Sequence, residues 1–236
     1  LMPAASVGHP DTNCTHGKGP GCAQRAQPLT AMWLRLGGRG IDTAMGYDNQ
    51  QYVGAAVRAA IAAGTVARSD VFVTTKINPG GRGGASSAGC TQANALAQVK
   101  ADVAQLNVGP LDLVLQHFPC SSTAGNQAVW KGLVQAKAQG LTRSIGVSHF
   151  TQAMLEGILS LGMGQPAVNQ CQLSVGSHDD ATIAFCKSKG ITGDVGLNHV
   201  GRLAIIKRQV HEAEVHAVGL QETRMDGPDL KVCDKF

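Results

Sequence analysis

The chain has 236 residues, of which 43% are hydrophobic and 15% charged, and its formal net charge is +4. This composition, with no block of like charges, excludes an intrinsically disordered chain and gives no reason to expect a nucleic acid or an anionic membrane as partner. The length lies at the low edge for one complete TIM barrel, typically about 250 residues, and so predicts one large domain.

No apolar run approaches the roughly 18 residues that span a bilayer, and residues 1–10 lack the basic and apolar regions of a signal peptide. The seven cysteines are an odd number without a close CxxC pair, which favours free thiols in a reducing compartment over a disulfide framework. We therefore expect a soluble, cytoplasmic protein.

The segment 9–22 holds two His and two Cys, but its spacing fits no zinc finger and a Gly/Pro-rich loop explains it better, so no metal site is expected.

Strand-like and helix-like segments alternate along the chain. Short apolar, β-branched runs predict strands at 2–8, 41–44, 71–77, 111–118, 144–150 and 167–173. Apolar residues that recur three and four apart, with glycines past most of the segment ends, predict helices at 49–63, 91–106, 126–139, 151–161 and 179–189. This alternation is typical of βαβ units and predicts a parallel sheet, either open or closed into a barrel. No GxGxxG leads from a strand into a helix, which weakens the open dinucleotide-binding alternative, and GGRGG at 80–84 is interpreted as a flexible connection.

Polar residues stand where three of the predicted strands end. Asp42 ends the second strand with Tyr47 just beyond it, Lys76 lies near the end of the third, and His117 near the end of the fourth. Reactive groups collect at the carboxyl ends of strands in parallel α/β sheets. Each residue alone also fits an ordinary structural role, such as a turn cap or a surface lysine, but their occurrence at three successive strand ends predicts a site.

These residue types suit the reduction of a carbonyl group. A free tyrosine, whose pKa is about 10, is a slow proton donor near neutrality, and a nearby ammonium group lowers that pKa because it favours the phenolate. We expect Lys76 to tune Tyr47 in this way. Asp42 would hold Lys76 in place, and His117 would orient the substrate carbonyl by a hydrogen bond.

The motifs around these residues resemble those of the aldo-keto reductases. GIDTAMGYDNQQYVG at 40–54 is similar to the family's signature around its catalytic Asp and Tyr, and VFVTTKI and LDLVLQHFP are similar to the strands that carry its Lys and His. IGVSHF, PAVNQCQL and FCKSKGI continue the family's order, so that the resemblance covers about residues 2–192.

The resemblance implies a (β/α)8 barrel of the TIM type, NADPH as cofactor and a small-molecule carbonyl substrate. It implies a catalytic tetrad of Asp42, Tyr47, Lys76 and His117. It also implies that the nicotinamide carboxamide is bound by Ser148, Asn169 and Gln170, with His149 in the place of the family's usual Asn.

The match stops where the family's last two strands would begin. The Tyr-Ser-Pro-Leu-like loop that follows the seventh strand has no counterpart, and Lys207 lies in a helix-like stretch instead of at the end of an eighth strand, where the family grips the 2′-phosphate of NADPH. We therefore expect an incomplete barrel of about six βα units at 1–192 and an unrelated tail at 193–236. The tail weakly resembles the beginning of an endonuclease/exonuclease/phosphatase domain, which would map a Mg²⁺-binding Glu to Glu222 and an Asn to Asn198.

Together these patterns predict an NADPH-dependent, monomeric reductase of aldehydes or ketones, with Tyr47 as general acid. Two alternatives remain open. One is a catalytically inactive, truncated barrel or fusion fragment, because a partial barrel leaves unpaired strand edges. The other is a fragment of a Mg²⁺-dependent endonuclease, which would need a metal-dependent activity on nucleic acid.

Overall fold

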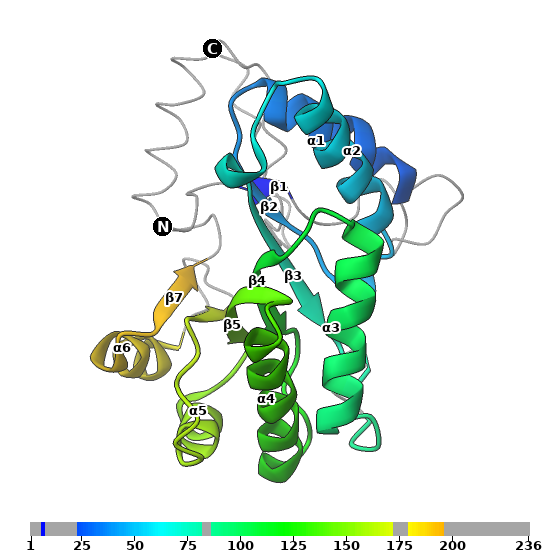
Figure 1. Ribbon diagram of the computed structural model, residues 1–236. Helices are drawn as coiled ribbons and strands as arrows, with labels where there is room; N and C mark the ends of the chain where they lie inside the picture. The colour runs from blue at the N-terminus through cyan, green and yellow to red at the C-terminus, as the bar shows by residue number, and fades with distance from the viewer. Residues whose placement is uncertain (1–5, 8–22, 82–85, 172–178, 196–236) are drawn as a thin grey trace, which may run out of the picture.

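A computed structural model describes residues 6–7, 23–81, 86–171 and 179–195 of the chain (Figure 1). Its strands are β1 Ser6–Val7, β2 Gly40–Asp42, β3 Phe72–Ile77, β4 Leu111–Gln116, β5 Thr142–Ser148, β6 Val168–Cys171 and β7 Thr192–Val195. Its α-helices are α1 Ala26–Arg35, α2 Gln50–Ala62, α3 Gln92–Leu106, α4 Thr123–Ala138, α5 Gln152–Leu159 and α6 Asp180–Lys189. Single 3₁₀ turns lie at Ala23–Arg25, Met45–Tyr47 and Arg68–Asp70.

The strands form one parallel sheet in which every strand pairs with the next one along the chain, in the order β1 to β7. A doubly wound sheet would reverse its order at a switch point, whereas unbroken sequential order is the arrangement of a TIM barrel. Figure 1 shows the helices following one another around one side of this sheet. The fold is therefore an incomplete barrel of the (β/α)8 type, and its described part contains six βα units and a seventh strand.

The structure confirms the six predicted strands and five predicted helices and adds two elements. Helix α1 was not among the predicted helices, and its sequence AQPLTAMWLR carries a proline in the first turn, where a missing N–H costs no helical hydrogen bond. Strand β7 has the sequence TGDV, which is short and contains a single large apolar residue, so it gave no strand signal. It pairs with β6 through the backbone and crosses the boundary predicted at residue 192. The rest of the predicted tail, including Asn198, Lys207 and Glu222, lies outside the described residues.

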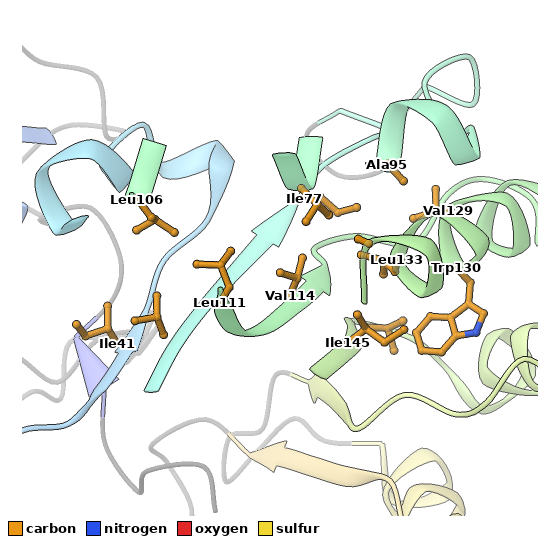
Figure 2. Packing of buried hydrophobic residues seen from close by; sticks show 14 of the residues in the cluster. Ile41, Ile77, Ala95, Leu106, Leu111, Val114, Val129, Trp130, Leu133 and Ile145 are labelled. Atoms are coloured by element: carbon orange, nitrogen blue, oxygen red, sulfur yellow. The ribbon is translucent and has the colours of Figure 1, made fainter. Parts of the chain in front are cut away.

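The main core lies between the sheet and the helices (Figure 2). Strand residues of the outer face and helix residues that cover them include Ile41, Ile77, Val114, Ile145, Ala95, Leu106, Val129 and Leu133. A smaller cluster of Leu113, Leu115 and Val168, with Phe72 packed against it, lies on the inner face. Because side chains alternate between the two faces of a strand, this division assigns every other strand residue to the barrel interior.

Several helices begin and end at the residue types that the sequence places there. Thr91 and Ser122 accept hydrogen bonds from the backbone N–H groups of Asn94 and Gly125, which caps α3 and α4. Helix α6 ends at Gly190, whose φ of 69° is left-handed. None of the described helices combines the length and the apolar character needed to cross a membrane.

One expectation about the cysteines was wrong. Cys90 and Cys120 form a disulfide, with their Cα atoms 6.4 Å apart. They are separated by 30 residues and follow different strands, so that only the parallel pairing of β3 with β4 brings them together. Cys186 is a free, buried thiol. The segment 9–22, weighed above as a zinc site, lies outside the described residues.

Candidate active site

Strand alternation brings most of the predicted site residues to the inner face of the sheet. Ile41 and Ile77 belong to the outer core, which leaves Asp42 and Lys76 on the inner face. His117 continues the inner-face row of Leu113 and Leu115. Because the strands are parallel, these positions meet at one end of the sheet, the carboxyl end, as the sequence predicted.

Lys76 is the centre of this group. Its side chain is 3% exposed and forms an ion pair with the Asp42 carboxylate. Its Nζ also donates to the carbonyl oxygen of Thr43 at 3.3 Å and to the Tyr47 hydroxyl at 3.4 Å. Burial opposes the charge on Lys76, but Asp42 and Tyr47 outweigh it and hold the pKa of the ammonium above its usual range. Lys76 is therefore a fixed positive charge beside a phenol.

The loop after β2 places the Tyr47 side chain next to Lys76. Met45–Tyr47 form a 3₁₀ turn that ends at Asp48, which has a left-handed φ of 55°. Thr43 braces this loop, because its hydroxyl donates to Asn49 Oδ1 at 2.6 Å. The result is a tyrosine ring whose centroid lies 5.1 Å from Lys76 Nζ.

His117 lies next to Tyr47 at the end of β4. Its backbone N–H donates to the Ile77 carbonyl oxygen at 2.9 Å, which continues the pairing with β3. Its ring meets the Tyr47 ring edge to face, with centroids 5.6 Å apart at an interplanar angle of 85°. The structure thus brings all four tetrad candidates together; their catalytic roles stay predictions.

The predicted carboxamide residues divide between the two faces of the sheet. Gln170 lies on the inner face and donates from Nε2 to Asp42 Oδ2 at 2.9 Å, while the Ser148 hydroxyl donates to the backbone carbonyl oxygen of Gln170 at 2.8 Å. Asn169 faces the helices instead. Its side chain bonds the backbone of Phe150 through both Nδ2 and Oδ1. The geometry groups Ser148 and Gln170 with the tetrad and leaves Asn169 apart from it.

His149 is exposed and has a left-handed φ of 59°, an uncommon conformation for a residue with a side chain. Its ring is nearly parallel to that of Phe118, with centroids 5.2 Å apart, and Phe118 in turn stacks on His117 at 4.3 Å. Sequence reasoning missed Phe118, although it directly follows His117 in the LQHFP motif. The stack joins the end of β4 to the end of β5.

The sequence of the chain is similar to those of known proteins. The sequence model of the aldo/keto reductase family matches residues 14–193. The chain belongs to this family. It is 39% identical over 141 residues to an aldo-keto reductase of Mycobacterium marinum, an alignment that covers 59% of this chain and 46% of the relative. It is 36% identical over 155 residues to 2,5-diketo-D-gluconic acid reductase B of a Corynebacterium species, covering 66% of this chain and 52% of the relative.

The fold agrees with solved structures of the same family. A silkworm (Bombyx mori) aldo-keto reductase, crystallised in complex with NADP, superposes with a TM-score of 0.70 at 25% identity, over 81% of this chain and 61% of the silkworm chain. The chain spans about half the length of the curated relatives it matches.

Proposed function

We propose that this protein is an NADPH-dependent oxidoreductase that reduces aldehydes or ketones to alcohols. The observation that carries the proposal is the buried Lys76, which is paired with Asp42 and donates to the hydroxyl of Tyr47. A positive charge at this place stabilises a developing phenolate, which is what a tyrosine needs in order to release a proton.

Each member of the tetrad has a step in this scheme. Tyr47 gives its hydroxyl proton to the carbonyl oxygen of the substrate. Lys76 stabilises the phenolate that remains, and Asp42 fixes the position of Lys76. His117, at the end of the neighbouring strand, hydrogen-bonds the carbonyl oxygen and turns the carbonyl toward Tyr47.

The inner-face residues of β5 and β6 fit the nicotinamide end of the cofactor. A carboxamide needs a donor and an acceptor side by side, and the Ser148 hydroxyl and the Gln170 carboxamide supply both beside Asp42. NADPH, when bound, supplies the hydride for the carbonyl carbon. The silkworm relative that shares this fold was crystallised with NADP, and a Corynebacterium relative is named for the reduction of a diketo acid. Both facts support a nicotinamide cofactor and a small-molecule carbonyl substrate.

The test is a titration of the purified protein with NADPH, followed by its fluorescence, and an assay of NADPH oxidation with a reactive aldehyde. The chain has two tyrosines, which gives a matched pair of variants. Tyr47→Phe should bind NADPH and lose turnover by about 10²–10⁴-fold, whereas Tyr52→Phe, on α2, should retain it. No saturable binding by the folded wild-type protein would refute the proposal and favour an inactive barrel.

The endonuclease alternative has no support among the described residues. Its candidate ligands Asn198 and Glu222 lie outside them. Within the described ranges, no three His, Cys, Asp or Glu side chains come together as a metal site would require.

A further inference from the structure

The Cys90–Cys120 disulfide lies at the same end of the sheet as the candidate active site. Cys90 directly precedes Thr91, the N-cap of α3, and Cys120 lies two residues before Ser122, the N-cap of α4. The bond therefore ties the loop after β3 to the turn after β4. His117 and Phe118 stand at the beginning of that second turn.

The first turn of α4 packs directly against the Cys90–Cys120 disulfide. Gly125 packs against it so closely that a Cβ there would lie 3.0 Å from Cys120 Cβ and 3.2 Å from Cys90 Cβ. Both cysteines are buried, with exposed fractions of 6% and 4%. A larger residue than glycine at 125 would displace the bridge, so the helix and the disulfide fit as one packed unit.

A hydrogen-bond network fixes the same turn from its other side. Asn126 Oδ1 accepts from the Cys120 backbone N–H at 2.7 Å and from Gln116 Nε2 at 3.0 Å. Gln116 Nε2 also donates to the Phe118 carbonyl oxygen at 3.0 Å and lies 3.5 Å from Cys120 Sγ. Gln116 Oε1 is buried without a hydrogen-bond partner among the described residues.

We propose that the Cys90–Cys120 disulfide is a positioning element of the candidate active site, which fixes His117 and Phe118 and whose reduction by a dithiol weakens substrate use. The proposal rests on the proposed function, because it assigns His117 the placement of the carbonyl. Reduction takes two electrons and two protons: the S–S bond breaks, Cys90 and Cys120 become thiols, and the dithiol becomes its own disulfide. The turn from His117 to Cys120 then loses its covalent link to the loop after β3 and is held by non-covalent contacts, among them those of Asn126 and Gln116.

Kinetics of three proteins test this, each measured before and after treatment with dithiothreitol: the wild type, the double variant Cys90→Ser/Cys120→Ser, and Cys186→Ser as a matched control. Reduction of the wild type, verified by alkylation and peptide mapping of both cysteines, should lower kcat/KM about tenfold, chiefly through KM. The dissociation constant for NADPH should stay within about twofold, because Ser148 and Gln170 stand on other strands. Cys186→Ser should respond as the wild type does, and the double variant should start low and not respond.

Amide hydrogen exchange of residues 116–121 gives a second measurement that needs no turnover. Reduction should speed exchange in this segment more than in α5, which the bond does not reach. If the wild type neither binds NADPH nor turns over, the proposed function fails, while faster exchange would still uphold the link between the bond and the turn. An unchanged kcat/KM and unchanged exchange in verified reduced protein would overturn the proposal, as would a dithiothreitol response that persists in the double variant. Should the double variant fail to fold, the reduced wild type decides alone.

Discussion

The paired strands β3 and β4 place buried titratable residues in opposite kinds of surroundings at their two ends. At the amino end, Asp112 accepts three hydrogen bonds: Oδ2 accepts from the Val73 N–H at 2.9 Å and from Arg68 at 2.8 Å, and Oδ1 from Arg143 at 2.9 Å. At the carboxyl end, the hydrogen bond from Lys76 Nζ to the Tyr47 hydroxyl is long, at 3.4 Å. The His117 ring contacts the rings of Tyr47 and Phe118. At the amino end, the Asp112 carboxylate is held by hydrogen bonds and two arginines. At the carboxyl end, Lys76, Tyr47 and His117 are groups that can donate or accept protons. Effects on stability and on activity should therefore separate between the two ends of this strand pair.

The largest effect should come from the carboxyl end. Lys76→Met removes the ammonium group that pairs with Asp42 and donates to Tyr47, so turnover of an aldehyde with NADPH should fall by about 10²–10⁴-fold. Lys100→Met, an exposed lysine of α3, is the matched control and should keep its kcat. An equal loss in both variants, or none in the first, would contradict the role assigned to Lys76.

The amino end should show the reverse. Asp112→Asn keeps one acceptor for the Val73 N–H but removes the negative charge that Arg68 and Arg143 share, and it should lower the free energy of unfolding in urea by about 2–4 kcal/mol. The kcat should not change. Asp70→Asn alters an exposed carboxylate that accepts a local backbone N–H, that of Ala67, and should cost less than about 1 kcal/mol. A fall in kcat for Asp112→Asn in protein that is still folded would mean that the two ends are coupled.

The carboxyl-end half of this contrast could be predicted from the sequence, because it depends on strand periodicity, whereas no pattern singled out Asp112. The apolar runs and the polar residues at their ends were enough to predict six strands and to expect Asp42, Tyr47, Lys76 and His117 at one edge. Short or weakly patterned elements, such as β7, left no such signal. Contacts that depend on strand pairing also left none, since the disulfide joins loops of two βα units. The opposite directions of Asn169 and Gln170 follow instead from the alternation of side chains along β6.

A second buried carboxylate, Asp102 of α3, sharpens the comparison because it has no positive partner in the described contacts. It accepts from Gln50 Nε2 at 2.7 Å, Gln50 Oε1 accepts from the Thr75 hydroxyl at 2.6 Å, and Asp102 Oδ2 is buried without a hydrogen bond among the described residues. Burial raises the pKa of Asp102 to about 7, against the opposing effect of Gln50.

Between the ordinary pKa of an aspartate and a pH of about 7, Asp102 is therefore protonated in the folded state and ionised in the unfolded chain. Stability from this group is complete below about pH 4 and is lost as the pH rises to about 7. Asp102→Asn cannot ionise, so its free energy of unfolding should fall less between pH 5 and pH 8 than that of the wild type, by about 1–3 kcal/mol. Parallel urea titrations of both proteins at the two pH values measure the difference. Identical pH dependence would show that Asp102 keeps an ordinary pKa in the fold.

The smallest effect should separate the two arginines that share Asp112. The side chain of Arg143 is 60% exposed and that of Arg68 is 21% exposed. Arg68 also donates to the backbone carbonyl oxygens of Val71, Val108 and Pro110. Solvent screens an exposed ion pair, so Arg143→Ala should cost less than about 1 kcal/mol of unfolding free energy. Arg68→Ala leaves several carbonyl groups without donors and should cost about 2 kcal/mol. Equal costs in the same urea assay would mean that charge alone holds the amino end, and that the hydrogen bonds of Arg68 to the loop before β4 add nothing to it.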